Sequence, residues 1–164
     1  MSHQEKRTIT NLIAGALVLA VYCVHVWGKY QAGLLNPSDL QAWAGQMLIF
    51  IVAGIAAAII IQILYHIIFA VCIAAREGKC DDANINKQIE ASLVEDEMDK
   101  LIELKSMRVG FIMGGAGFLG GLISLAAGGA PALMLNILFI SFGAGSLLEG
   151  LTKLYFYRRG VRNG

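Results

Sequence analysis

Glu149 is an acidic residue inside a long apolar run, nine residues before Arg158. In a regular helix this spacing places Glu149 about 13 Å inward from that arginine. Placing an ionisable side chain at membrane depth costs free energy, so such a residue indicates a function by default. For Glu149 the functional hypotheses are proton- or cation-linked transport and contact with a partner. Lys153 follows one helical turn later. A local ion pair, or a lysine that snorkels to the interface, is therefore the simpler alternative.

His66 lies with Gln62 and Tyr65 in another apolar run, ten residues before Arg76. Its depth is therefore comparable with that of Glu149, and we predict a contact between the two side chains inside the protein. Such a pair could relay protons. The alternative is a structural histidine held in place by hydrogen bonds.

Three acidic residues recur at i, i+3 and i+7 and share one face of a predicted helix: Asp96, Asp99 and Glu103. A single straight helix rarely supplies enough converging ligands for a divalent cation, and the sequence has no Gly-rich calcium loop. The cysteines, at positions 23, 72 and 80, lack the spacing of a zinc site or a disulfide framework. We therefore expect no metal site, and we interpret the acidic face as solvated or as a surface that binds a partner.

The sequence contains no phosphate-binding loop, nucleophile elbow or HExxH motif, and no Ser/His/Asp grouping is suggested by spacing. We therefore expect that the protein is not an enzyme, that it takes no cofactor, and that it does not bind nucleic acid. A buried membrane site built on His66 and Glu149 would be the one route to catalysis.

A stripe of small residues follows the acidic face, with spacings of 4, 3 and 4: Gly110, Gly114, Gly117 and Gly121. Such a stripe lets two helix backbones approach closely, as in GxxxG association. Three interpretations stay open: packing within one chain, the seam of a homodimer, and a ligand or ion path along the groove.

The composition is that of an integral membrane protein. Of 164 residues, 57% are hydrophobic and 15% are charged, whereas soluble domains carry about 25% charged residues. Four apolar segments predict an all-α, four-helix membrane bundle within a single domain, residues 1–164. The predicted spans are residues 9–27, 42–75, 109–127 and 132–157, and an amphipathic cytoplasmic segment, residues 76–108, leads into the third span.

The second apolar run is too long for one perpendicular crossing and too short for two. We expect one tilted helix that projects beyond the hydrocarbon, with two shorter helices bent near Gly54 as the alternative. Aromatic residues at positions 22, 27 and 30 suit an aromatic belt at the far end of the first span. Residues 36–39 predict a turn and a helix N-cap, and residues 128–131 predict a tight reversal.

The basic residues predict the topology. Twelve of the 13 Lys and Arg residues lie in the N-terminal, central and C-terminal segments, and Lys29 alone lies in an opposite loop. The positive-inside rule therefore places both termini and residues 76–108 in the cytoplasm. Residues 21–27, at the end of the first apolar run, are bulky where a cleavage site would have small residues, which indicates a retained anchor rather than a cleaved signal. Each half repeats the order of charged, apolar, turn, apolar and basic segments, which suggests a parallel duplication.

Residues 96–108, DEMDKLIELKSMR, resemble a DERDxxI…K…R signature found in a family of small, uncharacterised bacterial membrane proteins with four predicted spans. Residues 153–160, KLYFYRRG, are similar to the ending of that family. Met98 stands where the signature has arginine, which weakens any charge network at that position. The resemblance implies a four-span fold without a settled activity. The genes of that family often lie near small DNA-binding regulators, which implies a signalling or stress-response setting.

Together these features predict a multi-pass protein of a bacterial inner membrane that forms a homodimer in the lipid bilayer. The leading hypothesis is a non-catalytic protein that binds or regulates a partner protein through the cytoplasmic helix of residues 86–108. The alternative is a small dimeric transporter or channel that uses Glu149 and His66. A transporter should need the Glu149 carboxylate, whereas a binding protein should depend on the acidic face. The substrate or partner does not follow from the sequence.

Overall fold

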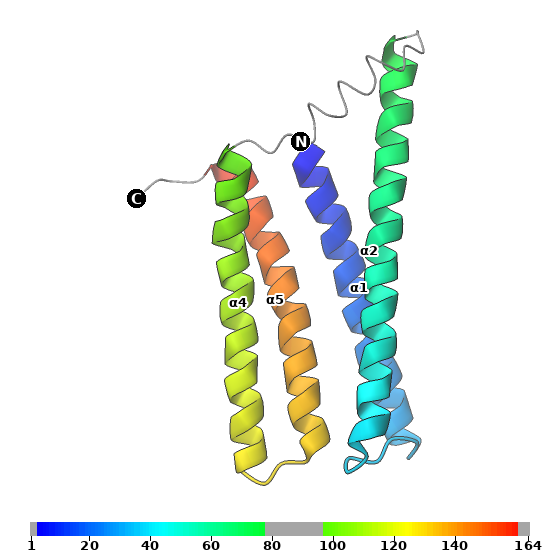
Figure 1. The fold of residues 1–164 in the computed structure, drawn as a ribbon, viewed down its shortest axis with the longest axis vertical. Helices are drawn as coiled ribbons and strands as arrows, with labels where there is room; N and C mark the ends of the chain where they lie inside the picture. The colour runs from blue at the N-terminus through cyan, green and yellow to red at the C-terminus, as the bar shows by residue number, and fades with distance from the viewer. Residues whose placement is uncertain (1–2, 78–96, 161–164) are drawn as a thin grey trace.

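A computed structural model of the chain describes residues 3–77 and 97–160, with all side chains there except those of residues 3, 4, 65, 66, 69, 70 and 72–77. The described ranges contain four α-helices: α1 (His3–Gln31), α2 (Leu40–Glu77), α4 (Glu97–Ala126) and α5 (Pro131–Arg159) (Figure 1). Each helix is long and apolar enough to cross a membrane. The predicted all-α class with four candidate spans is therefore confirmed.

The helices run past the apolar segments at several ends. α1 already begins at His3, and Thr10 Oγ1 donates a hydrogen bond to the Lys6 carbonyl within it at 3.0 Å. α2 continues without a break through Gly54 for 38 residues, about 57 Å. The prediction of one long helix is therefore confirmed over the two-helix alternative. α4 is helical from Glu97, the first residue described after the gap, and the acidic residue Asp96 lies outside the described part.

Local sequence signals set the two turns. Asp39 caps α2, because its Oδ1 accepts a hydrogen bond from the Ala42 backbone N–H at 3.0 Å. After α4 the chain reverses at Gly128, whose φ of 84° is in the left-handed region that favours glycine. Pro131 then opens α5 at a position where its missing N–H costs no helical hydrogen bond. Both predicted turns are present.

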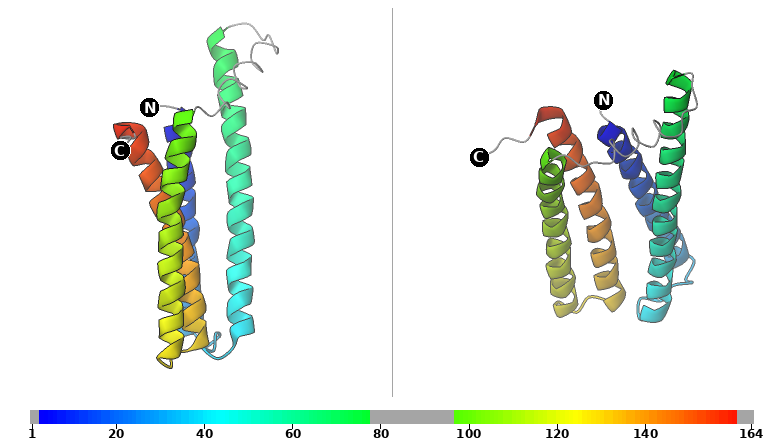
Figure 2. Two further views of the ribbon diagram at one scale, coloured as in Figure 1. Left: turned by 60° about the vertical axis from the view of Figure 1, so that its left-hand side comes forward. Right: turned by 45° about the horizontal axis from the view of Figure 1, so that its top comes forward.

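The four helices form two hairpins that turn at the same end of the molecule (Figures 1 and 2). We call this the turn end, and we call the opposite end, where α1 and α4 begin and α5 finishes, the terminal end. α5 is the central helix, since it packs against α4, α1 and, to a lesser degree, α2. Over the described ranges no Cα atom of α4 comes within 8 Å of α1 or α2. The helices therefore form an open row, α4–α5–α1–α2, rather than a closed bundle.

The glycine stripe of α4 faces α5 of the same chain. A Cβ placed on Gly117 would overlap the Ser141 side chain, and one placed on Gly145 of α5 would lie 2.8 Å from the Gly110 carbonyl oxygen. Gly114 meets the Phe142 ring, and Gly121 meets Met134. Because lipid tails are as apolar as side chains, such close van der Waals packing is what holds membrane helices together. The stripe is used for packing within the chain.

The contact between α5 and α1 reverses the pattern, with glycines on α5 and leucines on α1. A Cβ on Gly143 would lie 2.9 Å from Leu19 Cδ1, and one on Gly150 would lie 2.9 Å from Leu12 Cδ1. Each leucine therefore fills a space that the glycine leaves open. This contact joins the two hairpins.

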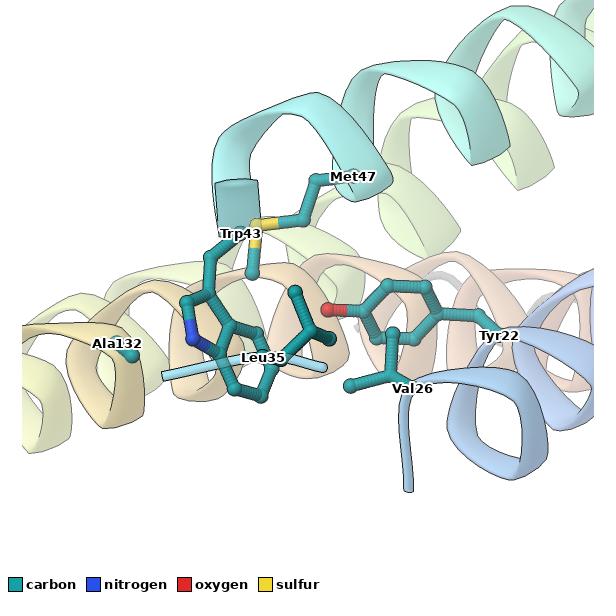
Figure 3. Packing of buried hydrophobic residues seen from close by; sticks show 6 residues of the cluster. All are labelled: Tyr22, Val26, Leu35, Trp43, Met47 and Ala132. Atoms are coloured by element: carbon teal, nitrogen blue, oxygen red, sulfur yellow. The ribbon is translucent and has the colours of Figure 1, made fainter. Parts of the chain in front are cut away.

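A compact apolar cluster forms at the turn end from both hairpins (Figure 3): Tyr22, Val26, Leu35, Trp43, Met47 and Ala132. Tyr22 is 1% exposed, and its hydroxyl donates a hydrogen bond to Asn136 Oδ1 at 2.7 Å. The expectation that Tyr22 belongs to an aromatic belt was therefore wrong, whereas Trp27 and Tyr30 are exposed as expected. The cluster ties α1 and α2 to the beginning of α5.

We expect Gly117→Ala to lower the free energy of unfolding by about 1–3 kcal/mol relative to Gly115→Ala, because overpacking a tight contact costs this much. The two glycines are two residues apart on α4, and both variants gain the same helix propensity. Only the Cβ at position 117 meets a neighbour, since a Cβ on Gly115 would have nothing within 4 Å. Unfolding in mixed detergent micelles measures the difference. Equal stability of the two variants would contradict the tight α4–α5 contact.

Candidate functional site

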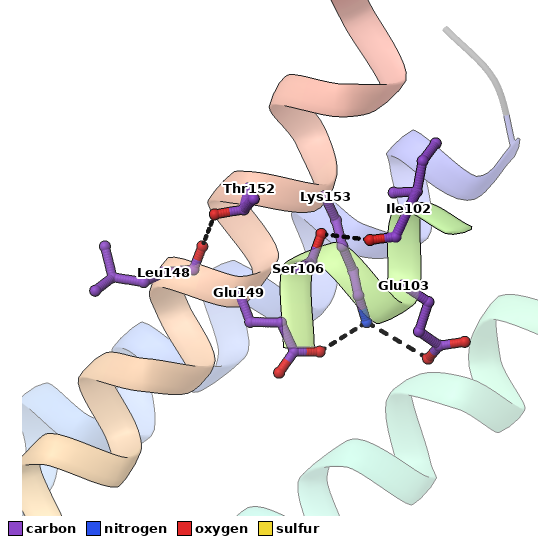
Figure 4. A network of polar contacts seen from close by, with 7 residues as sticks. All are labelled: Ile102, Glu103, Ser106, Leu148, Glu149, Thr152 and Lys153. Carbon is purple, nitrogen blue, oxygen red and sulfur yellow. Dashed lines mark hydrogen bonds and ion pairs between the residues drawn. The ribbon is translucent and has the colours of Figure 1, made fainter. Parts of the chain in front are cut away.

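Lys153 lies between two carboxylates at the terminal end of the α4–α5 pair (Figure 4). Its Nζ is 2.8 Å from Glu149 Oε1, one turn earlier on α5, and 3.6 Å from Glu103 Oε1 on α4. An acid four residues before a lysine is the favourable order for such a pair. The structure thus contains the local pair that the sequence suggested, and it adds a second acid from the neighbouring helix.

Glycine makes room for this cluster. A Cβ placed on Gly110 would lie 3.2 Å from Glu149 Oε2, so the Glu149 carboxylate occupies space that a larger residue on α4 would fill. Two nearby hydroxyl groups turn back onto their own helices instead of joining the cluster. Ser106 Oγ, which is fully buried, and Thr152 Oγ1 donate hydrogen bonds to carbonyl oxygens four residues earlier, each at 2.7 Å.

The cluster borders a small polar pocket of about 140 Å³ between α1, α4 and α5. The pocket brings together side chains that are far apart in the sequence. Its lining consists of Arg7, Thr8, Asn11, Asp99, Glu103, Lys153 and Tyr157. Asp99 and Glu103 belong to the acidic face that the sequence predicts to be solvated or to bind a partner, and in the structure they border a cavity between helices of their own chain.

A second ion pair joins the first turn of α1 to the last turn of α5. Arg158 Nε lies 3.9 Å from Glu5 Oε1, and Glu5 is 8% exposed. Sequence reasoning missed Glu5, although an acid in the first turn of a helix complements the helix dipole. The order of the helices in the sequence does not show that the first turn of α1 lies beside the basic end of α5, so this pair could not be predicted.

The remaining candidate residues lie apart from this cluster or outside the description. Gln62 is exposed on α2. The side chains of Tyr65 and His66 are not among those described, so the His66–Glu149 contact stays a prediction. Within residues 3–77 and 97–160, no three His, Cys, Asp or Glu side chains come together in a way that could hold a metal ion.

The arrangement can therefore bind charge but has no evident reactive group. Lys153 is held by two acids, and Arg158 by one. Ion pairs of this kind position helix ends, and polar groups beside them that remain unused can bind a polar ligand.

Comparisons with protein-family models, with curated proteins and with solved structures found no match. The resemblance of residues 96–108 and 153–160 to the four-span bacterial family stays a prediction.

We expect Lys153→Met to lower the free energy of unfolding by about 1–3 kcal/mol, because it leaves half-buried carboxylates without their partner. Adding Glu149→Gln should recover part of this loss, since the more deeply placed charge is then removed as well. Lys100→Met, at an exposed lysine of the same end, is the matched control and should be near neutral. Unfolding in mixed micelles measures all three. A Lys153→Met protein as stable as the control would show that the cluster contributes nothing.

Proposed function

We propose that this multi-pass membrane protein is non-catalytic and binds a partner protein through one exposed face at the beginning of α4. Four residues at i, i+4, i+7 and i+8 share this face: Lys100, Leu104, Met107 and Arg108. All four side chains are exposed, and Leu104 is 68% exposed. We call these residues the α4 face.

The observation that carries the proposal is the continuity of α4. The helix runs without interruption from its charged first turns into the apolar part that packs on α5. Lys153 links α5 to Glu103 on the same charged turns. A partner bound at the α4 face would therefore act on a helix that is fixed to the rest of the membrane domain.

The chemistry of the α4 face indicates the kind of partner. Two cationic side chains flank two exposed apolar ones, which suits an amphipathic helix with leucine-like anchors beside acidic residues. The acids Asp99 and Glu103 border the pocket toward α1 and α5. We therefore propose the α4 face, and not the acidic face, as the site of contact.

The distribution of charge supports an orientation of the protein in the membrane. We propose that the terminal end lies in the cytoplasm of a bacterial inner membrane, because basic residues gather at the beginning of α1, the beginning of α4 and the end of α5, whereas Lys29 lies in the last turn of α1. A homodimer would have to use a surface other than the glycine stripe, since that stripe packs on α5 within the chain.

A transport pathway has less support than partner binding. The Glu149 carboxylate is engaged by Lys153, and the seam between α4 and α5 is filled by the glycine contacts. A pathway would need polar groups along the length of the helices. The polar pocket lies instead at the terminal end, between the first turns of α1 and the last turns of α5.

Photocrosslinking tests the proposed face with a control on the same helix. We expect a photoreactive residue at Leu104 to form a discrete adduct with a partner protein in cells, and one at Ile123 to form none. Both positions are 68% exposed, but Ile123 lies in the apolar part of α4. Exposure alone therefore cannot produce the difference.

Two further variants decide whether an adduct is specific. Reversing the charge at Lys100 and Arg108 together should reduce the Leu104 adduct about ten-fold or more, because each reversal sets like charges against the partner. Glu149→Gln should leave the adduct unchanged. An adduct that survives the charge reversal, or that disappears with Glu149→Gln, would refute partner binding at the α4 face.

A further inference from the structure

The polar pocket at the terminal end adjoins a much larger apolar groove at one shared lining residue. This groove, of about 710 Å³, lies between α1, α2 and α5. Asn11 lines both the pocket and the groove. A ligand with a polar head and an apolar tail could therefore occupy the two together, with its head at the terminal end.

Small residues create the groove. The groove is lined by small residues from three helices, whose short side chains leave room between them: Ala14 and Gly15 on α1, Gly54 and Ala57 on α2, and Ser146 on α5. The lining is almost wholly apolar, and its volume falls within the range of about 300–1,000 Å³ typical of ligand sites. The groove is therefore suited to a hydrocarbon chain.

The charges of the pocket restrict the head. Two cationic side chains, Arg7 and Lys153, stand near three carboxylates, those of Asp99, Glu103 and Glu149. Lys153 is already held by two of these acids. In the part of the chain that the structure describes, neither Arg7 nor Asp99 has a hydrogen bond or an ion pair. One guanidinium from α1 and one carboxylate from α4 thus remain available in the same cavity.

We propose that the pocket and the groove together bind a phospholipid whose headgroup carries a primary ammonium next to its phosphate, as in phosphatidylethanolamine. Arg7 contacts the phosphate, because a guanidinium matches phosphate geometry with two parallel hydrogen bonds. Asp99 accepts hydrogen bonds from the ammonium. One acyl chain follows Asn11 into the groove.

The headgroup decides the selectivity. Moving an acyl chain from the bilayer into an apolar groove provides little free energy of binding, because both surroundings are apolar. A purely anionic headgroup could use Arg7 but would place a negative charge beside the Asp99 carboxylate. A quaternary ammonium has no N–H to donate to Asp99. The amine-bearing zwitterion is the headgroup that uses both available side chains.

Native mass spectrometry of the delipidated full-length protein tests the site. Three lipids with identical oleoyl chains are compared: phosphatidylethanolamine, phosphatidylcholine and phosphatidylglycerol. We expect phosphatidylethanolamine to reach half-occupancy at a concentration about ten-fold lower than the other two, the factor that one charge-assisted hydrogen bond of about 1.4 kcal/mol provides. This comparison uses the unaltered protein, so it does not depend on the folding of any variant.

Variants then assign the two contacts. Asp99→Asn should lower the affinity for phosphatidylethanolamine to that for phosphatidylcholine. The affinities for phosphatidylcholine and phosphatidylglycerol should not change. Arg7→Gln should weaken the binding of all three lipids. Arg159→Gln, at an exposed arginine of the same end that does not line the pocket, should weaken the binding of none. Equal binding of the three lipids, or tightest binding of phosphatidylglycerol, would overturn the proposal. The lipid site and the α4 face are separate, so either can fail while the other stands.

Discussion

The close approach of α4 and α5 is the constraint on which the other features of the structure depend. Gly117 accepts the Ser141 side chain, and Gly110 and Gly145 bring the two backbones together. In a bilayer there is no hydrophobic gain from helix association, so contact at this distance must provide the attraction. The same approach sets Glu103 of α4 beside Lys153 of α5 and leaves room over Gly110 for the Glu149 carboxylate.

α5 also makes the contacts that connect the α4–α5 hairpin to the α1–α2 hairpin. Its glycines at positions 143 and 150 receive leucines of α1, and Asn136 near its beginning accepts the hydrogen bond from Tyr22. Its last turn meets Glu5 through Arg158. α2 is attached mainly at the turn end, through the cluster around Trp43 and Met47, and the groove lies beside it. Packing is tight around α5 and looser toward α2, and the space for a ligand lies on the looser side.

The helices and turns could be predicted from the sequence, but the contacts between the helices could not. Apolar length predicted the four helices, while Asp39, Gly128 and Pro131 predicted the turns, because these signals are local. Glu149 and Lys153 could be paired because they lie on one helix, one turn apart. The burial of Tyr22 and the Glu5–Arg158 pair could not be predicted. In a membrane helix every face is apolar, so hydrophobic periodicity does not show which face packs against which partner.

Both proposed binding surfaces include residues of α4, the helix that packs tightly on α5. α4 presents the α4 face outward, and its acids border the polar pocket, which shares Asn11 with the apolar groove. Both surfaces lie at the terminal end, so a bound lipid and a bound partner would contact neighbouring sides of the same helical turns. Both proposals require that this end faces one side of a bilayer that the four helices cross.

Cysteine labelling in cells tests that requirement most directly. In a cysteine-free background, a membrane-impermeant maleimide is applied to proteins with single cysteines at Ser38 or Ala127, beside the two turns, and at Lys100 on the α4 face. We predict that the first two are labelled from outside intact cells and that position 100 is labelled only after permeabilisation. Labelling of all three positions from the same side would contradict four crossings with both hairpin turns outside.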